Sequence, residues 1–438
     1  MEDRTPTVQE HDATLRAAWS LLRRNRDFRK LYIASVISFG GDWFLFVALG
    51  GLILQVTGKA TSVALLIVSQ ELPIFLATPW AGWLVDRLDR KRVMIACDFA
   101  RTAICAAFLL IGSHNLWLAY VLIATLSMFT AVFDPASSAA TPNLVDPADL
   151  GVANAMNGSV WGTMLAVGAA LGGVIATIFG NDTAFLVDAA SFALSALLLS
   201  GIKRRFSEDR GHEERVGVVD ATVETARYAR RDHRVLALIS VKFGFGLAAG
   251  VLALIAVFAR QVFHGGDIGF GLLMASRGVG ALLGPFLGHR IAGRDRQRLL
   301  PAIAIALAVF GFGYLALGLA PTLSLAAVAI LVAHLGGGAQ WMLSTYGLQR
   351  LVPDRIRGRI FAFDYALITL SLAVSSIVAG SLSDALGPRE AVMIVGGIAL
   401  AWSGTWWLLT KNVRRTPIFQ ASGDGPDGAV APISIAVD

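Results

Sequence analysis

The chain has 438 residues, of which 55% are hydrophobic and only 16% are charged, whereas an ordinary globular chain carries about 25% charged residues. Apolar runs of about 20 residues recur along its whole length, and each can cross a hydrocarbon core of ~30 Å. The class is therefore a polytopic α-helical membrane protein, because a β-barrel would need alternating segments of about 10 residues. The net charge of +6 does not indicate nucleic-acid binding, because the basic residues form short clusters between the apolar runs.

Residues 1–30 form a charged arm before the first apolar run, which is too long for a signal-peptide core. A charged segment at 202–234 then divides the apolar runs into an N-terminal half at 31–201 and a C-terminal half at 235–410, with a tail at 411–438. The twelve predicted spans are 31–54, 61–84, 93–112, 116–138, 153–178, 183–201, 235–260, 268–289, 299–319, 322–345, 360–383 and 389–410.

The distribution of basic residues predicts the orientation. Of the 37 Lys and Arg residues, 31 lie in the N-terminal arm, the tail, the middle segment and three other connections on the same side of the predicted membrane. Basic residues accumulate on the cytoplasmic side, so we expect both termini and the middle segment in the cytoplasm. The connection at 139–152 disagrees, because it has no Lys or Arg.

The two halves are related in sequence. Residues 26–29 (Arg-Asp-Phe-Arg) match residues 231–234 (Arg-Asp-His-Arg) at an offset of 205, and Gly173 matches Gly380 at an offset of 207. Internal symmetry of two six-helix halves is typical of transporters whose substrate site lies between the halves near the bilayer midplane.

A charged turn between the second and third spans carries a family motif. Its matching positions are Gly82, Leu84, Asp86, Arg87, Arg90 and Lys91, and Asp89 replaces a second glycine. With the twelve spans in two halves, the chain resembles the major facilitator superfamily over residues 20–412. Residues 135–158 and 188–192 resemble the branch of macrolide and enterobactin exporters, although the Arg-x-x-Gln-Gly motif of many drug:proton antiporters is absent from the fourth span. The resemblance implies an all-α major facilitator fold of two pseudo-symmetric six-helix halves.

The resemblance also gives this turn a mechanical role. It implies that Gly82, Asp86, Arg87, Arg90 and Lys91 form a conformational latch, in which the glycine admits the eleventh helix and the aspartate lies at that helix's N-terminus, where negative charge is favoured. The alternative is a solvated turn whose charges only set topology. The corresponding turn of the second half, at 284–290, lacks the acid, so the expected latch is one-sided.

Ionisable residues near the centres of spans are the main functional candidates, because a charge there costs about 3 kcal/mol or more. Asp42 is the best-placed group to bind and release a proton, and Glu71 is a second candidate. Arg277 needs either an acid, Asp42 or Glu71, or an anionic substrate. Trp43 and other aromatic residues could line a cavity for a bulky amphipathic ligand. The alternatives are hydrogen-bonded acids and rings that only pack.

Other charged residues have more structural interpretations. Asp98 and Arg101 lie three apart on one helix face, which predicts a structural ion pair, with a part in proton relay as the alternative. Lys242 is expected to extend to the cytoplasmic face. Asp364 lies near the cytoplasmic margin and Asp188 near the outer margin, where it could cap a helix.

The resemblance implies a secondary active transporter in a bacterial inner membrane that exports a bulky amphipathic molecule (drug, macrolide or siderophore) by alternating access, driven by proton entry. The expected partners are this substrate, protons and the lipid bilayer, and we expect a monomer. The chain shows no motif for an enzyme, an ATPase, a cofactor or a metal. The alternatives are an importer or lysophospholipid flippase of the same fold, and a non-transporting membrane sensor.

Overall fold

The computed structural model describes residues 15–112, 114–204, 206, 226–292, 298–352 and 354–415, and this part of the chain contains helices and no strands. The helices are α1 (Leu15–Arg24), α2 (Arg26–Thr57), α3 (Ala60–Arg87), α4 (Arg90–Ala107), α5 (Trp117–Leu144), α6 (Leu150–Phe179), α7 (Asn181–Ser200), α9 (His233–Ala249), α10 (Leu252–Val257), α11 (Gly266–Ala292), α12 (Leu299–Leu319), α13 (Leu323–Leu351), α14 (Asp354–Leu386), α15 (Pro388–Leu409) and α16 (Lys411–Arg415). Short 3-10 turns lie at Phe108–Leu110 and Pro147–Asp149, and a π-helical turn, η3, at Phe258–Val262.

Twelve helical runs in the described residues are long and apolar enough to cross a membrane, which confirms the predicted number of spans. Several helices extend past the predicted spans; α2, for example, begins at Arg26 and α3 ends at Arg87. The first predicted span, 31–54, lies within α2, whose N-cap is Asn25, and the Asn25 side chain accepts a hydrogen bond from the Phe28 amide.

The seventh span is not the single helix that the sequence predicts. It consists of α9, α10 and the π-helical turn η3. At the break, Gly250 lies against the backbone of Ser375 in α14, where a Cβ atom would overlap the Ser375 carbonyl. The Ser375 hydroxyl donates to the carbonyl of Gly246 at 2.8 Å. The interruption therefore brings the backbones of the seventh and eleventh spans into direct contact.

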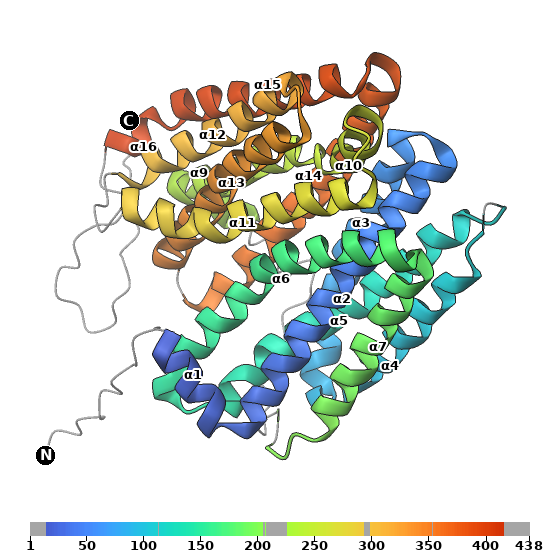
Figure 1. Ribbon diagram of the computed structural model, residues 1–438. Helices are drawn as coiled ribbons and strands as arrows, with labels where there is room; N and C mark the ends of the chain where they lie inside the picture. Colours follow the sequence, from blue (N-terminus) through green and yellow to red (C-terminus); the bar gives the residue numbers. More distant parts are fainter. Residues whose placement is uncertain are drawn as a thin grey trace, which may run out of the picture.

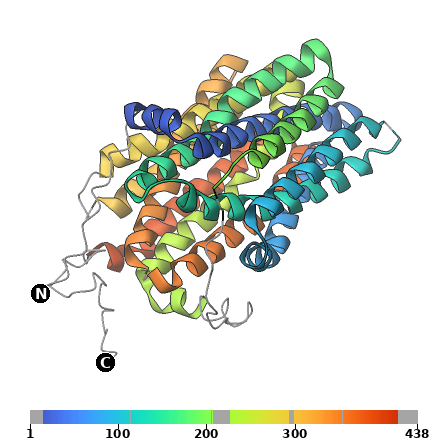
Figure 2. The ribbon, with the colours of Figure 1, turned by 90° about the horizontal axis from the view of Figure 1, so that it is seen from below.

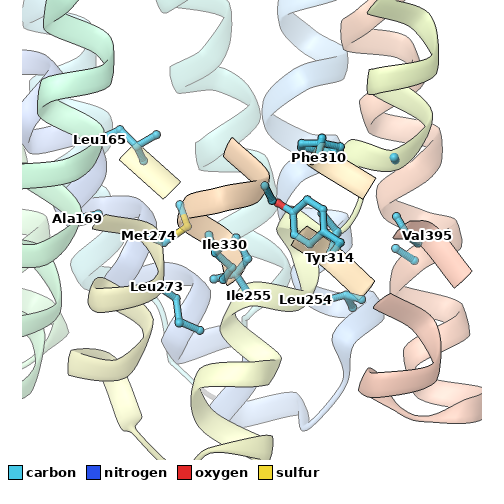
Figure 3. Packing of buried hydrophobic residues seen from close by; sticks show 14 of the residues in the cluster. Leu165, Ala169, Leu254, Ile255, Leu273, Met274, Phe310, Tyr314, Ile330 and Val395 are labelled. Atoms are coloured by element: carbon cyan, nitrogen blue, oxygen red, sulfur yellow. The ribbon is translucent and has the colours of Figure 1, made fainter. Parts of the chain in front are cut away.

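The spans form two groups, α2–α7 and α9–α15, whose long helices run roughly side by side (Figures 1 and 2). Across the groups, α6 packs on α11 and α3 packs on α14. Figure 3 shows Leu165 and Ala169 of α6 close to Met274 of α11 in the buried apolar cluster. Large apolar side chains also face outward, for example Leu319 and Leu408, each 72% exposed. Such an apolar outer surface fits a lipid environment.

In the described part of the chain, side-chain hydrogen bonds between the halves lie at one end of the bundle. Helices α1 and α16 lie at the opposite end, which we call the terminal end (Figure 1). At the other end, which we call the distal end, the Asp384 carboxylate of α14 accepts hydrogen bonds from the amides of Ala60 and Thr61 at the start of α3, at 2.7 and 3.0 Å. There the Gln261 side chain donates to the carbonyl of Gly58 at 3.0 Å. These bonds close the distal end in this conformation.

The connection at 139–152, which lacks basic residues, is bound by α1. Arg24 of α1 forms an ion pair with Asp149, and the Asn25 side chain donates to the carbonyl of Leu144 at 2.8 Å. The buried Leu21 packs with Val152 and Met156 in a small apolar cluster. The basic charge that this connection lacks is therefore supplied by the N-terminal arm.

Candidate functional site

A cavity of about 560 Å³ lies between the two halves. Asp42, Trp43, Glu71 and Arg277, the four cavity residues that the sequence singles out, all line it. They come from α2, α3 and α11, so both halves contribute. The lining continues toward the terminal ends of the helices, where it includes Gly158, Pro285 and Met342.

Close packing of α2 on α6 sets the aromatic wall of the cavity. A Cβ atom on Gly168 of α6 would lie 3.1 Å from the carbonyl oxygen of Gly40 and 3.2 Å from Trp43 Cβ, so a larger residue here would push the two helices apart by a few tenths of an ångström. The indole rings of Trp43 and Trp161 therefore lie on one wall, with their centroids 6.3 Å apart and an interplanar angle of 71°. Phe46 supports Trp43 edge-on at 5.7 Å.

Arg277 contacts aromatic rings where the sequence predicts an acid or an anionic substrate as its partner. Its guanidinium carbon lies 5.7 Å from the ring centroid of Trp43 and 5.6 Å from that of Trp161. Its Nε atom is buried and has no hydrogen-bond partner among the described residues. Glu71 interacts with Arg277 electrostatically, but no ion pair joins them in the described part of the chain. Ring faces attract cations, which explains how the charge is held.

A second polar group is buried inside the N-terminal half, next to Asp42. Asp188 of α7 is fully buried and accepts hydrogen bonds from the thiol of Cys105 and the hydroxyl of Ser191, both at 3.2 Å. A Cβ atom on Gly41 would collide with the Asp188 carboxylate, so α2 lies directly against this acid. Asp42 interacts electrostatically with Asp188. Asp188 is therefore a candidate that the sequence prediction missed, and its carboxylate contacts α2 and α4 instead of capping a helix end.

The only sequence signals for Asp188 are the hydroxyl three residues later, Ser191, and the glycine that precedes Asp42. Neither signal indicates that α2 packs against Asp188. The position of Asp188 along its own span does not predict its burial, because packing of α7 against α2 encloses the carboxylate.

Asp98 and Arg101 form an ion pair in α4, with 2.5 Å between Asp98 Oδ1 and Arg101 Nη2. Both side chains are buried. The guanidinium carbon of Arg101 lies 4.0 Å from the ring centroid of Phe133 and 4.4 Å from that of Phe192. This pair is enclosed by aromatic rings and brings one positive charge close to Asp42 and Asp188.

Lys242 of α9 does not extend to the membrane surface as predicted. It is buried and forms an ion pair with Asp364 of α14, with 2.5 Å between Lys242 Nζ and Asp364 Oδ2. Its ammonium group also donates to the hydroxyl of Thr345 at 3.0 Å and lies 5.1 Å from the ring centroid of Trp341. The partner lies 122 residues further along the chain, so a prediction from position within the span could not include it.

Two basic residues of the motif turn, Arg90 and Lys91, contact other segments of the N-terminal half. Arg90 is buried and donates to the carbonyls of Ala139 and Phe206, and Lys91 donates to those of Ser200 and Ile202. These contacts hold the turn to its own half. The side chains of Gly82, Asp86 and Arg87 lie outside the described residues. No three His, Cys, Asp or Glu side chains in the described part of the chain converge as metal ligands.

Two six-span groups around a shared cavity define the architecture of a secondary transporter. The family model described as transmembrane secretion effector matches residues 16–418, and the chain belongs to this family of the major facilitator superfamily.

Comparison with individual proteins agrees with this membership. The chain is 27% identical over 410 residues to the uncharacterized MFS-type transporter YfiS of Bacillus subtilis, covering 90% of this chain and 96% of that protein. It is 24% identical over 414 residues to the multidrug efflux pump Tap of Mycobacterium tuberculosis, covering 91% and 97%. A bacterial homologue of the human lysosomal transporter Spinster, in an inward-facing and unoccupied conformation, has a TM-score of 0.69 at 15% identity, covering 91% and 98%. The last likeness shows the fold alone.

Proposed function

We propose that the protein exports a bulky, partly apolar small molecule from a bacterial cytoplasm, and that proton entry drives this export. The observation that carries the proposal is the position of Asp42. It lines the cavity between the halves, and it also interacts with the buried acid Asp188 inside the N-terminal half. A group in this place can respond both to a ligand in the cavity and to the protonation of the buried acids.

The balance of charge supports proton binding. Four carboxyl groups, those of Asp42, Asp98, Asp134 and Asp188, share the guanidinium of Arg101, and Asp98 already holds it at 2.5 Å. Carboxylates that share one site oppose each other's ionisation, so a proton is the simplest additional counter-charge. Acids buried within a membrane domain commonly form proton relays.

The arrangement of the halves supports alternating access. Hydrogen bonds close the distal end, and the cavity lining continues toward the terminal end. With both termini in the cytoplasm, as the basic residues indicate, this conformation is the inward-facing one. In the proposed arrangement, the protein has a cytoplasmic arm at 1–30, membrane-spanning halves at 31–201 and 235–410, and cytoplasmic segments at 202–234 and 411–438. It works as a monomer in the inner membrane.

The relative named a multidrug efflux pump supports the direction of transport, and the cavity of about 560 Å³ with an aromatic wall supports a bulky amphipathic substrate. Drugs, macrolides and siderophores all fit this description. Everted vesicles separate export from import, because an exporter concentrates its substrate inside them when a pH gradient is imposed.

The test of proton coupling is the variant Asp42→Asn. Efflux would be measured in everted vesicles with a panel of bulky amphipathic dyes, using any dye that the wild type transports. We expect the variant to remain in the membrane at the wild-type level and to lose uptake driven by the pH gradient. Asp182→Asn removes an exposed acid in the first turn of α7 and is the matched control. Full pH-driven transport in Asp42→Asn would refute the assignment.

A further inference from the structure

The aromatic wall of the cavity has the composition of a cation-binding site. Trp43 and Trp161 present two indole rings at a steep angle, and Glu71 adds a carboxyl group to the same half of the cavity. Sets of aromatic rings with an acid nearby recognise organic cations, because the ring faces attract positive charge and release it more easily than a tight ion pair would. We call these three residues the indole box.

The indole box already holds a cation in this conformation. The guanidinium of Arg277 lies 5.7 and 5.6 Å from the two ring centroids, and it is therefore about equally distant from both rings. Its buried Nε atom has no hydrogen-bond partner among the described residues. The rings hold the group without the full set of hydrogen bonds that a permanent structural arginine normally makes.

This contact crosses between the halves. Trp43 and Trp161 belong to α2 and α6, whereas Arg277 belongs to α11. The next residue, Gly278, packs on α6 at Ala166, where any Cβ atom would collide with the Ala166 backbone. The close approach of the two backbones is what allows the arginine of one half to reach the rings of the other.

We propose that Arg277 occupies the place of the substrate, and that the transported molecule carries an organic cation that displaces Arg277 from the indole box. This inference rests on the proposed export function and names its substrate class. The charges of the cavity are compatible with the exchange. Two acidic residues, Asp42 and Glu71, and one arginine, Arg277, line it, so the cavity can accept one further positive charge while Arg277 stays inside it.

Displacement also connects binding with movement. While Arg277 lies in the box, it joins the C-terminal half to two rings of the N-terminal half. A ligand that takes its place removes this contact between the halves and substitutes its own. The apparent affinity for a cation is therefore lowered by the fraction of molecules in which Arg277 fills the box.

The inference can be tested by equilibrium binding to the purified full-length protein in detergent, with no pH gradient present. The probes are tetraphenylphosphonium and tetraphenylborate, which have nearly the same shape and opposite charges. We expect the wild type to prefer the cation. Arg277→Gln should bind tetraphenylphosphonium about five- to tenfold more tightly, whereas Trp43→Leu, Trp161→Leu and Glu71→Gln should each bind it about five- to tenfold more weakly, as expected for the loss of one contact with a partly desolvated cation.

Two controls keep the test decisive. Trp117→Leu replaces an exposed tryptophan at the start of α5 and should bind as the wild type does. Arg277→Lys keeps the positive charge, and its affinity should stay within about twofold of the wild type, so it serves if the Gln variant elutes as an aggregate. Weaker or unchanged cation binding in Arg277→Gln, or a preference of the wild type for tetraphenylborate, would overturn the proposal. Neither result depends on Asp42 or on a gradient, so the proposed export function is judged separately by its own assay.

Discussion

One carboxylate, that of Asp384, accepts three of the hydrogen bonds that close the distal end, and its removal should shift the protein toward the opposite conformation. Helix α3 begins after Lys59, whose side chain makes no capping hydrogen bond. The cap comes from the other half: Asp384 accepts bonds from the Ala60 and Thr61 amides at 2.7 and 3.0 Å and from the Thr61 hydroxyl. The substitution to study is Asp384→Ala.

The magnitude follows from these contacts. Replacing a capping aspartate by alanine costs about 0.5–2 kcal/mol, and its charge at the helix N-terminus adds about 0.3–1 kcal/mol. Asp384 is exposed at the end of α14, where water screens the charge, so we expect a total of about 1–2 kcal/mol. All of it is lost from the conformation in which the distal end is closed, which changes the equilibrium between the two conformations by about 5- to 30-fold.

Spin labels on the two sides of the distal end would measure this shift by pulsed electron–electron double resonance, which gives the distribution of distances between them. His114 of the N-terminal half and Glu390 of the C-terminal half are exposed there and can be changed to Cys, while Cys97 and Cys105, both buried and unpaired, are changed to Ser. Asp384→Ala should add a population at longer distance. Asp182→Asn, which removes an exposed acid from the same end within one half, should not. An unchanged distance distribution in Asp384→Ala would show that the cap does not hold the halves together.

Two further predictions concern stability. Lys242→Met should lower thermal stability in detergent by the equivalent of about 3–5 kcal/mol, because it leaves Asp364 buried without its partner. The double variant Lys242→Met/Asp364→Leu should recover most of this loss, and a double variant no more stable than the single one would contradict the pairing. Asp232 lies just before the seventh span, where burial opposes its ionisation but hydrogen bonds from the side chain and amide of Arg234 outweigh burial and lower its pKa. The stabilising contribution of the Asp232 carboxylate is therefore present above the ordinary pKa of about 3.9 and lost only as the pH falls below this value. The destabilisation by Asp232→Ala, about 1 kcal/mol, should then be the same at pH 5.5 and pH 8. A destabilisation that changes between these two pH values would refute the lowered pKa.

The architecture could be predicted from the sequence because each span must form the hydrogen bonds of its own backbone internally when it lies in lipid. Apolar runs of about 20 residues therefore identify the helices, and the basic residues between them indicate one common side. The same logic found Asp42, Glu71 and Arg277, since a charge at the centre of a span needs a cavity or a partner. The structure brings all of them to one cavity.

Partners on other helices could not be predicted in this way. The distance of Lys242 from the end of its span suggested an extended side chain, but Asp364 faces it from a helix 122 residues away. For Arg277, the sequence predicted an acid or anionic ligand, whereas two indole rings hold it. A sequence gives the depth of a charge along its own helix, but the opposing side chain depends on how the helices pack.

Helix packing also changes the interpretation of the motif turn, because it shows which helix lies opposite. The acid of the second span, Asp86, has no counterpart in the turn after the eighth span, which predicted a one-sided latch. The neighbour of α3 across the halves is α14, which is the eleventh span. Helix α3 ends at Arg87 at the terminal end and α14 ends at Leu386 at the distal end. Each helix carries an aspartate, Asp86 or Asp384, within two residues of its last residue.

Asp384 caps the start of α3 when the distal end is closed. We expect Asp86 to take the corresponding role at the start of α14 when the terminal end is closed, as the superfamily resemblance implies. Since rigid halves that close one end open the other, the two acids would act alternately, and removing them should shift the conformational equilibrium in opposite directions.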